Sequence, residues 1–328
     1  MKVLFIGGTG IISSACTQLA VQNGGELFLL NRGQTQRPIP DGVETIRGDI
    51  RDKEAIKKIL KNVRFDVVVD WIAFVPQHVE TDIELFRGKT GQYVFISSAS
   101  AYQTPPASLP VTESTPLYNP FWQYSRDKIA CEQRLIDAYR KEHFPMTIVR
   151  PSHTYDKTLL PFHGGYTFLD RLKRGKKVII HGDGTSLWVL THHRDFAKGF
   201  FGLLGNPQAI GETFHITSDQ VLTWDQICRT MADLLGVPAN IVHVPSEVIA
   251  AYDAEWGASL LGDKTHCMIF DNTKIKRFVP GFQATIPFVQ GAREIIEWYE
   301  EPSRQVIDKE FDRLMDSIIE AQEKAWPG

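Results

Sequence analysis

Short apolar runs and longer amphipathic stretches take turns along the first half of the chain. The apolar runs, which we expect to form strands, are KVLFIGG, ELFLLNRG, VETIRGD, FDVVVDWIAF, GQYVFISSAS and FPMTIVRPS. Stretches with helical spacing lie between several of them, such as CTQLAVQNGG, KEAIKKILKN and DKIACEQRLIDAYRKE. Buried strands that alternate with helices are typical of a parallel sheet covered on both faces. The pattern therefore predicts an α/β fold built on a doubly wound parallel sheet.

A glycine-rich turn, GGTGIIS, lies between the first expected strand and the first expected helix. A dinucleotide pyrophosphate binds at such a turn, because backbone N–H groups and the positive end of the helix meet there. Gly7 and Gly10 match the first two glycines of this fingerprint, and Ser13 stands where the third is usual. The context of strand, turn and helix predicts a Rossmann-type dinucleotide site. The alternative is a glycine-rich turn that binds no ligand.

The second expected strand ends in Asn31 and Arg32. An NAD site usually has a carboxylate here that binds the ribose 2′-hydroxyl. Asparagine removes the charge that would repel a 2′-phosphate, and the Arg32 guanidinium fits one. The sequence therefore favours NADP as cofactor, with NAD as the alternative if Arg32 is solvated and Asn31 binds the ribose hydroxyls.

The alternation of strands and helices breaks after about residue 155. We expect residues 1–155 to form the dinucleotide-binding Rossmann domain, to which 191–218 return as a helix and a strand. Residues 156–190 and 219–328 would then form a smaller, mixed, substrate-binding part that ends in C-terminal helices. We expect this part to pack on the carboxyl edge of the sheet.

Composition excludes several classes of function. The chain has 328 residues, of which 43% are hydrophobic and 23% charged, as in an ordinary globular protein. A net charge of −3 gives no basic footprint for nucleic acid. No apolar run approaches the roughly 20 residues of a membrane helix, and the apolar start is too short for a secretory signal. The four cysteines lie far apart in the sequence, so we expect reduced thiols in a cytoplasmic protein.

Tyr124 and Lys128, in the pentapeptide YSRDK, lie about one helical turn apart and project from the same face of a helix. A nearby ammonium stabilises a phenolate and lowers the pKa of a tyrosine. The spacing by itself is common, so its meaning depends on the rest of the sequence.

The chain resembles the extended short-chain dehydrogenases/reductases, which include NAD(P)-dependent nucleotide-sugar epimerases and dehydratases. The matching segments are GGTGIIS, GDIRD, DWIAF, FISSASAY, YSRDK, VRPSHTY and HGDGT. The resemblance implies that Ser98, Tyr124 and Lys128 are catalytic. It implies a cofactor-binding set made of Gly7, Thr9, Gly10, Ile11, Ile12, Asn31, Arg32, Asp49, Ile50, Trp71, Ile72, Ala73, Phe74, Tyr124, Lys128, Pro151 and His153.

The resemblance also implies roles for the three catalytic residues. Tyr124 exchanges a proton with a substrate hydroxyl or carbonyl while hydride moves to or from the nicotinamide. Lys128 lowers the pKa of Tyr124 and holds the nicotinamide ribose, and Ser98 hydrogen-bonds the substrate oxygen.

Several positions depart from the family pattern. Ala99 and Ser100 stand where dehydratases of this family have an Asp-Glu pair, so dehydration is not expected. Trp188 stands where an arginine commonly binds the substrate diphosphate, and either Arg194 or Lys264 could replace it. Epimerisation of a nucleotide sugar, and reduction or epimerisation of another substrate, both stay open. The substrate is expected to be a small molecule.

A binding module without redox turnover is the alternative class of function, because the chain also resembles divergent relatives of chloroplast stem-loop RNA-binding proteins. The acidic balance and the intact Ser98, Tyr124 and Lys128 speak against it. The basic segment RLKRGKK is expected to be a solvated helix end, and adjacent His192 and His193 point in different directions, so no metal site is predicted. The family resemblance implies a homodimer through helices that include the one starting at Tyr124. The amphipathic C-terminal stretch is expected to pack rather than to anchor a membrane.

Overall fold

The computed structural model describes residues 1–35 and 37–325. Its central sheet has seven parallel strands in the order β11-β6-β5-β4-β1-β2-β3. These strands are β1 (Lys2–Ile6), β2 (Glu26–Asn31), β3 (Glu44–Arg47), β4 (Phe65–Asp70), β5 (Thr90–Ile96), β6 (Met146–Pro151) and β11 (Thr213–Ile216). The strand order reverses at β1, which is the arrangement of a doubly wound sheet. The predicted fold class is confirmed.

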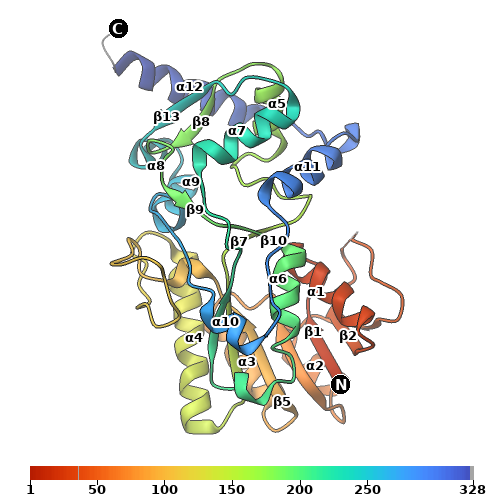
Figure 1. Cartoon of the computed structure of the whole chain (residues 1–328). Coiled ribbons are helices and arrows are strands. Elements are labelled where there is room, and N and C mark those ends of the chain that lie inside the picture. The colour runs from red at the N-terminus through yellow and green to blue at the C-terminus, as the bar shows by residue number, and fades with distance from the viewer. Residues whose placement is uncertain (36, 326–328) are drawn as a thin grey trace.

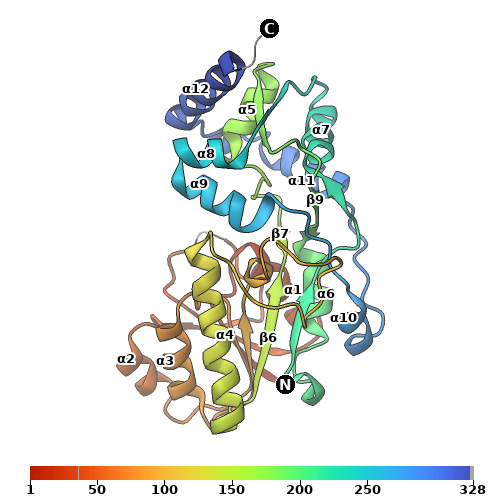
Figure 2. The same ribbon diagram turned by 90° about the vertical axis from the view of Figure 1, so that its left-hand side faces the viewer.

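Helices cover both faces of this sheet, because alternate residues of each strand point to opposite sides. Val3 and Phe5 of β1 face one cluster, which also contains residues of α1 (Ile11–Gln22) and α6 (His193–Phe201). Leu4 and Ile6 face the other cluster. The helices on that second face are α2 (Lys53–Ile59), α3 (Pro76–Phe86) and α4 (Gln123–Glu142), which lie side by side in Figure 2.

Two later segments of the chain pack against the sheet. The first contains α6 and β11, and β11 pairs with β6. The second contains α10 (Thr273–Phe278), whose Ile275 lies in the same cluster as Phe282 and the α6 residues. This second segment falls within the range that the sequence pattern assigned to the substrate-binding part.

The remaining C-terminal elements lie over the carboxyl ends of the strands, in the upper half of Figure 1. They are β7 (His153–Tyr155), α5 (Tyr166–Lys173), β8 (Val178–His181), β9 (Leu187–Trp188), β10 (Leu190–His192), β12 (Leu222–Thr223), α7 (Trp224–Leu235), β13 (Ile241–Val244), α8 (Ser246–Tyr252), α9 (Ala254–Ser259), α11 (Phe288–Trp298) and α12 (Lys309–Ala325). Short 3-10 or π turns are η1 (Ala99–Ala101), η2 (Pro207–Ala209), η3 (Leu260–Lys264) and η4 (Pro302–Arg304). The paired strands β7 and β10 connect the two halves.

The basic segment at the end of α5, residues 171–177, holds α12 in place. Arg171 is 1% exposed and bonds the carboxylates of Asp312 and Asp316, at 2.5 and 2.7 Å. Lys176 bonds Asp316 as well, at 2.7 Å. The prediction that this segment is a solvated helix end is therefore wrong for Arg171. Within the described chain, no helix is long and apolar enough to cross a membrane.

Candidate active site

The turn between β1 and α1 is built on glycines that other residues could not replace without strain. Gly7 and Gly8 have φ values of +97° and +93°. A Cβ on Gly8 would lie 2.5 Å from Leu29 Cδ2, so the strand and the turn pack too closely for a side chain. Ser13 Oγ accepts the Gly10 N–H at 2.8 Å and closes the turn. The serine in place of the third glycine thus supports the turn.

A pocket of about 360 Å³ opens beside this turn, at the carboxyl ends of β1, β2, β3 and β4. Eight of the predicted cofactor residues line it: Gly7, Thr9, Asn31, Arg32, Asp49, Ile50, Ile72 and Phe74. Arg51 and His78 line it as well, although the sequence did not single them out. Arg51 donates to the Ile72 carbonyl, and His78 Nδ1 accepts the Phe74 N–H at 3.1 Å. Both residues therefore hold the wall formed by 71–74.

Asn31 has one hydrogen-bonding group to offer a ligand. Its Oδ1 accepts the Gly33 N–H at 2.9 Å, which fixes the side chain. Its Nδ2 is buried and has no partner among the described residues. Such a donor, with the close approach that Gly7 allows, fits a dinucleotide whose ribose lies at Asn31.

Other predicted cofactor residues lie around the pocket without lining it. Trp71 packs in the core, with its ring 5.5 Å from Phe5 and 4.9 Å from Phe200. Gly10, Ile11 and Ile12 form the start of α1, and Ala73 is fully buried. Pro151 ends β6, whereas His153 lines a second cavity in the C-terminal part.

The three predicted catalytic residues come from two neighbouring elements. Ser98 follows β5, and its Oγ lies 2.9 Å from Ser100 Oγ. Ser125 Oγ donates to Ser100 Oγ at 2.8 Å, so a row of hydroxyls connects Ser98 to the first turn of α4. Tyr124 and Lys128 lie in that same end of α4.

Tyr124 is enclosed by aromatic rings. Its ring centroid is 4.8 Å from Trp122 and 6.5 Å from Phe74, which also lines the dinucleotide pocket. Burial raises the pKa of Tyr124 to about 12, and the Ser98 hydroxyl opposes that rise. The expected lowering of this pKa by Lys128 is therefore not found, and Tyr124 keeps its proton at neutral pH.

Lys128 is 2% exposed, and its ammonium is held by the backbone. Nζ donates to the Ala73 carbonyl at 2.6 Å and to the Ile96 carbonyl at 2.8 Å. It lies 5.8 Å from the centroid of the Tyr124 ring. Burial lowers the pKa of Lys128 to about 8, so the ammonium form predominates at neutral pH. Lys128 thus ties together the ends of β4 and β5, between which the pocket wall lies.

A buried pair of carboxyl groups supports the same wall. Asp70 Oδ1 accepts the Ile72 N–H at 2.6 Å, and Asp82 accepts the Tyr93 hydroxyl at 2.6 Å. Burial first, and the Asp70 carboxylate second, raise the pKa of Asp82 well above its usual range. The raised pKa favours the protonated form of Asp82, which lessens its repulsion of the Asp70 carboxylate. Asp82, fixed by Tyr93, therefore lies beside the carboxylate that holds the 71–74 backbone.

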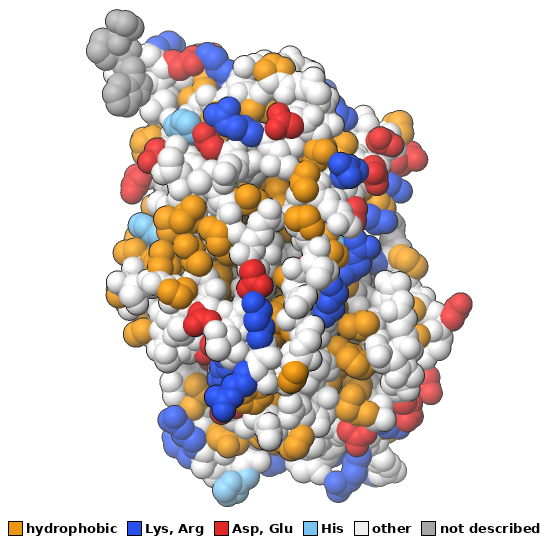
Figure 3. All heavy atoms as spheres, in the orientation of Figure 1, with side chains coloured by type: hydrophobic (Ala, Val, Ile, Leu, Met, Phe, Trp, Pro, Cys, Tyr) orange, Lys and Arg blue, Asp and Glu red, His pale blue; other side chains and the backbone are white. Residues whose placement is uncertain are grey.

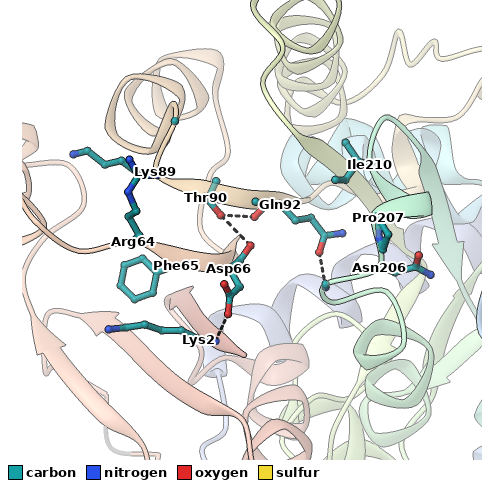
Figure 4. A pocket seen from close by; sticks show the side chains of 13 residues that line it. Lys2, Arg64, Phe65, Asp66, Lys89, Thr90, Gln92, Asn206, Pro207 and Ile210 are labelled. Carbon is teal, nitrogen blue, oxygen red and sulfur yellow. Dashed lines mark hydrogen bonds between the residues drawn. The ribbon is translucent and has the colours of Figure 1, made fainter.

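A larger cavity of about 530 Å³, whose lining residues are drawn in Figure 4, lies at the opposite edge of the sheet. It is lined by Lys2, Asp66 and Thr90, at the amino ends of β1, β4 and β5. Ser98 lies beyond the carboxyl end of β5. This cavity therefore takes no part in the site. Among residues 1–35 and 37–325, no group of three or more His, Cys, Asp or Glu could hold a metal ion.

Known proteins resemble the chain in sequence and fold. The model of the NAD dependent epimerase/dehydratase family matches residues 3–217. The chain is 24% identical over 294 residues to 2'-dehydrokanamycin reductase from Streptomyces kanamyceticus. The alignment covers 86% of this chain and 80% of that protein. It is 27% identical over 259 residues to the chloroplast stem-loop binding protein of 41 kDa b from Arabidopsis thaliana, with 74% of this chain and 65% of that protein covered.

The structure of UDP-glucuronic acid 4-epimerase from Bacillus cereus, in complex with UDP-glucuronic acid and NAD, has a TM-score of 0.75 with this structure. The two chains are 19% identical, and 92% of this chain and 100% of that chain are covered. The chain belongs to the NAD dependent epimerase/dehydratase family. This confirms the resemblance to the extended short-chain dehydrogenases/reductases.

Proposed function

We propose that this protein is an NAD(P)-dependent oxidoreductase or epimerase that acts on a hydroxyl or keto carbon of a sugar-like substrate, free or nucleotide-linked. The observation that carries the proposal is that Tyr124 and Lys128 both lie against Phe74, a wall residue of the dinucleotide pocket, with the Ser98 hydroxyl beside Tyr124. A hydroxyl, a phenol and an ammonium at the carboxyl edge of a doubly wound sheet suit proton transfer beside a dinucleotide.

A bound nicotinamide would supply hydride donation or acceptance at the substrate carbon. Tyr124 would transfer the proton at the substrate oxygen, and Ser98 would hydrogen-bond that oxygen and orient it. Lys128 would keep the Ala73 and Ile96 carbonyls in place, and its ammonium would bind the ribose of the dinucleotide. Trp122 and Phe74 would exclude water from the Tyr124 ring.

Reduction of a carbonyl is the direction that the site favours. Burial raises the pKa of Tyr124 to about 12, so its hydroxyl is protonated at neutral pH. A protonated phenol donates to a carbonyl oxygen that accepts hydride at its carbon, whereas oxidation needs the phenolate first. The first of the two relatives described above is named a reductase, which agrees with this direction.

We also propose NADP as the preferred cofactor. Asn31 carries no charge that would repel a 2′-phosphate, and the exposed Arg32 lines the pocket beside it. Arg51 adds a second guanidinium to the same pocket. A guanidinium that bonds a phosphate contributes roughly 1.5–3 kcal/mol.

The test of the proposed function has two stages. Calorimetry with NAD and NADP first measures whether a dinucleotide binds. Carbonyl compounds and sugars are then added with the reduced dinucleotide, and the nicotinamide absorbance is followed. Loss of absorbance that depends on both the protein and the added compound would support the proposal. Absence of any dinucleotide binding would contradict it.

A homodimer and a cytoplasmic location are further proposals. The four cysteines form no disulfide, which supports a reducing compartment.

The outward positions of α4, which include Arg126, Ala130 and Gln133, are exposed and mostly polar. An interface there would therefore be formed mostly by polar contacts, with the exposed Tyr139 as its large apolar side chain. Sedimentation at micromolar concentration tests the dimer, and a monomer would remove it.

The alternative is a binding module for RNA, which the likeness to the chloroplast stem-loop binding protein favours. Against it, Figure 3 shows basic side chains interspersed with acidic ones on the face that it presents. Retardation of a stem-loop RNA in a gel at physiological salt, without any dinucleotide turnover, would favour this alternative over the redox function.

A further inference from the structure

The C-terminal part contains a cavity of about 170 Å³, and half of its lining residues carry aromatic or imidazole rings. These rings are His153, Phe162, His163, Phe168, His181, Trp224, Trp256 and Phe311. Two pairs are stacked nearly parallel: the rings of His163 and Trp256 at 5.1 Å, and those of Phe162 and Phe168 at 4.0 Å. A cavity of roughly 150 Å³ lined by apolar side chains can hold one six-membered ring. The size therefore suits a single ring.

The walls of this cavity carry almost no net charge. Lys264 is the ammonium among its lining residues, and Nζ bonds the neighbouring Asp263 carboxylate at 2.8 Å. Burial lowers the pKa of His153 to about 3 and that of His181 to about 4, so both rings are neutral at physiological pH. A diphosphate carries at least two negative charges and needs cations or several donors. The cavity provides a diphosphate with one cation, Lys264, whose charge is already balanced by Asp263.

Of the two residues that could replace the missing arginine, neither is free for a diphosphate. Lys264 is paired with Asp263. Arg194 lies outside this cavity and is paired with the Glu294 carboxylate. Trp188 itself is buried, with its ring 5.6 Å from that of Trp224.

Two nitrogen atoms of residues that line the cavity have no hydrogen-bond partner in the described chain. They are Nε2 of His153 and Nε1 of Trp224, and Trp224 is only 1% exposed. A buried polar group without a partner is costly, unless a ligand supplies one. A ligand oxygen would satisfy the Trp224 N–H, and a hydroxyl could bond to His153.

The cavity is connected to Tyr124 by a continuous set of contacts. Lys264 of η3 lines the cavity, and its Nζ lies 5.7 Å from the Trp122 ring. Trp122 in turn packs on Tyr124 at 4.8 Å. Asn119 Nδ2 donates to the Gly262 carbonyl at 2.6 Å and fixes η3 against this side. The cavity and Tyr124 are therefore separated by two side chains, those of Lys264 and Trp122.

We propose that this cavity binds the non-reacting end of the substrate, and that this end is an uncharged ring bearing a hydroxyl or ether oxygen, not a nucleoside diphosphate. The inference rests on the proposed function, because Tyr124 is taken as the reacting side. It separates this chain from an enzyme that selects its substrate by a diphosphate. The ring contacts and the two unpartnered nitrogens select the ligand instead.

The test compares two probes, phenyl β-D-glucoside and UDP, by calorimetry and by quenching of tryptophan fluorescence. Phenyl β-D-glucoside is expected to bind. UDP is expected to bind at least about tenfold more weakly. Tighter binding of UDP than of the glucoside would overturn the inference.

Two variants locate the binding. Ser259 lines the cavity, so the larger side chain of Ser259→Phe should fill it. The affinity for phenyl β-D-glucoside should then fall by about tenfold or more. Trp256→Leu removes one stacked ring and should weaken it as well. Trp298→Leu is the matched control, because Trp298 lies half-buried outside this cavity and should leave binding unchanged. Binding that Ser259→Phe and Trp256→Leu both leave intact, in folded protein, would overturn the inference.

The outcome can be told apart from failure of the proposed function. Glucoside binding that Ser259→Phe abolishes, together with no dinucleotide binding, would support the ring site while contradicting the redox function. Dinucleotide-dependent turnover of a nucleoside diphosphate sugar would support the redox function and overturn the ring site.

Discussion

At the level of single residues, the proposed preference for NADP rests on Asn31 and Arg32. The Gly33 N–H fixes the amide of Asn31, whose buried Nδ2 has no partner among the described residues. Arg32 lies next to it, exposed and beside the pocket. The sequence alone indicates this pair, because Asn31 ends an expected strand and Arg32 is the next residue. It does not indicate which atoms of Asn31 are free, since that depends on the turn at Gly33.

Replacing Arg32 with Ala should weaken the binding of NADP by about ten- to a hundredfold, because one charge-assisted contact contributes roughly 1.5–3 kcal/mol. The affinity for NAD should change little. Calorimetry with both dinucleotides measures the change. The exposed Arg64, at the opposite edge of the sheet, provides the control variant Arg64→Ala. Equal or tighter binding of NAD by the unaltered protein would show that Arg32 does not select the phosphate.

Tyr124 shows where residue-level reasoning from sequence stops. The spacing to Lys128 correctly places both residues in one end of α4. It does not reveal that Lys128 donates to two backbone carbonyls, or that Trp122 and Phe74 enclose Tyr124. These contacts come from residues distant in the sequence, and they change the direction of the pKa shift.

The strands are the elements that the sequence predicts well. The strands from β1 to β6 are recognised either by an apolar run or by the residue that ends them, which is a glycine, a serine or a charged residue. The end of each strand can therefore be located in the sequence. Helix α3 is different, because its buried stripe contains Asp82 between Val79 and Ile83. A carboxyl group in the apolar stripe breaks the helical pattern. Only the structure shows that Tyr93 and Asp70 accommodate it.

Asp82 therefore supplies a test of how α3 supports the site. Asp82→Asn keeps an acceptor for the Tyr93 hydroxyl and, like a protonated Asp82, carries no charge beside Asp70, so stability should change little. Asp82→Leu leaves the buried Tyr93 hydroxyl without its acceptor and should lower the free energy of unfolding by about 2–3 kcal/mol. Urea unfolding measures both. If the Asn variant is as unstable as the Leu variant, Asp82 is not protonated in the folded protein.

At the scale of the whole molecule, the sequence predicts a Rossmann domain and a C-terminal part, but it does not predict how the C-terminal part is packed. The cavity there takes Phe162, Trp224, Trp256 and Phe311 from four separate segments. The basic segment that holds α12 has its acidic partners about 140 residues further on. Local patterns contain no information on such pairings.

Buried histidines make the stability of the whole molecule depend on pH. His181 is 6% exposed, and burial lowers its pKa to about 4, against about 6.5 in an unfolded chain. Between these two values the unfolded chain binds more protons, so acidification favours unfolding. Between pH 7.5 and pH 5, His181 should contribute about 2 kcal/mol of lost stability.

Urea unfolding at these two pH values tests this contribution. The His181→Phe variant should lose about 2 kcal/mol less than the unaltered protein over the same interval. The variant His143→Asn, at an exposed helix end, should lose as much as the unaltered protein. Equal losses in all three proteins would show that His181 is protonated in the folded state.

The most direct measurement of the central claim is the turnover of Tyr124→Phe, followed by nicotinamide absorbance with a substrate found in the screen. The variant loses only a hydroxyl, so it should fold and bind the dinucleotide like the unaltered protein. Its turnover should fall by about 10²–10⁴-fold, the usual loss for an acid/base group, and Ser98→Ala should cost less because Ser98 orients the oxygen without transferring the proton. Turnover of Tyr124→Phe at the unaltered rate would contradict the account, and the protein would then be a member of the family that uses this fold for another purpose.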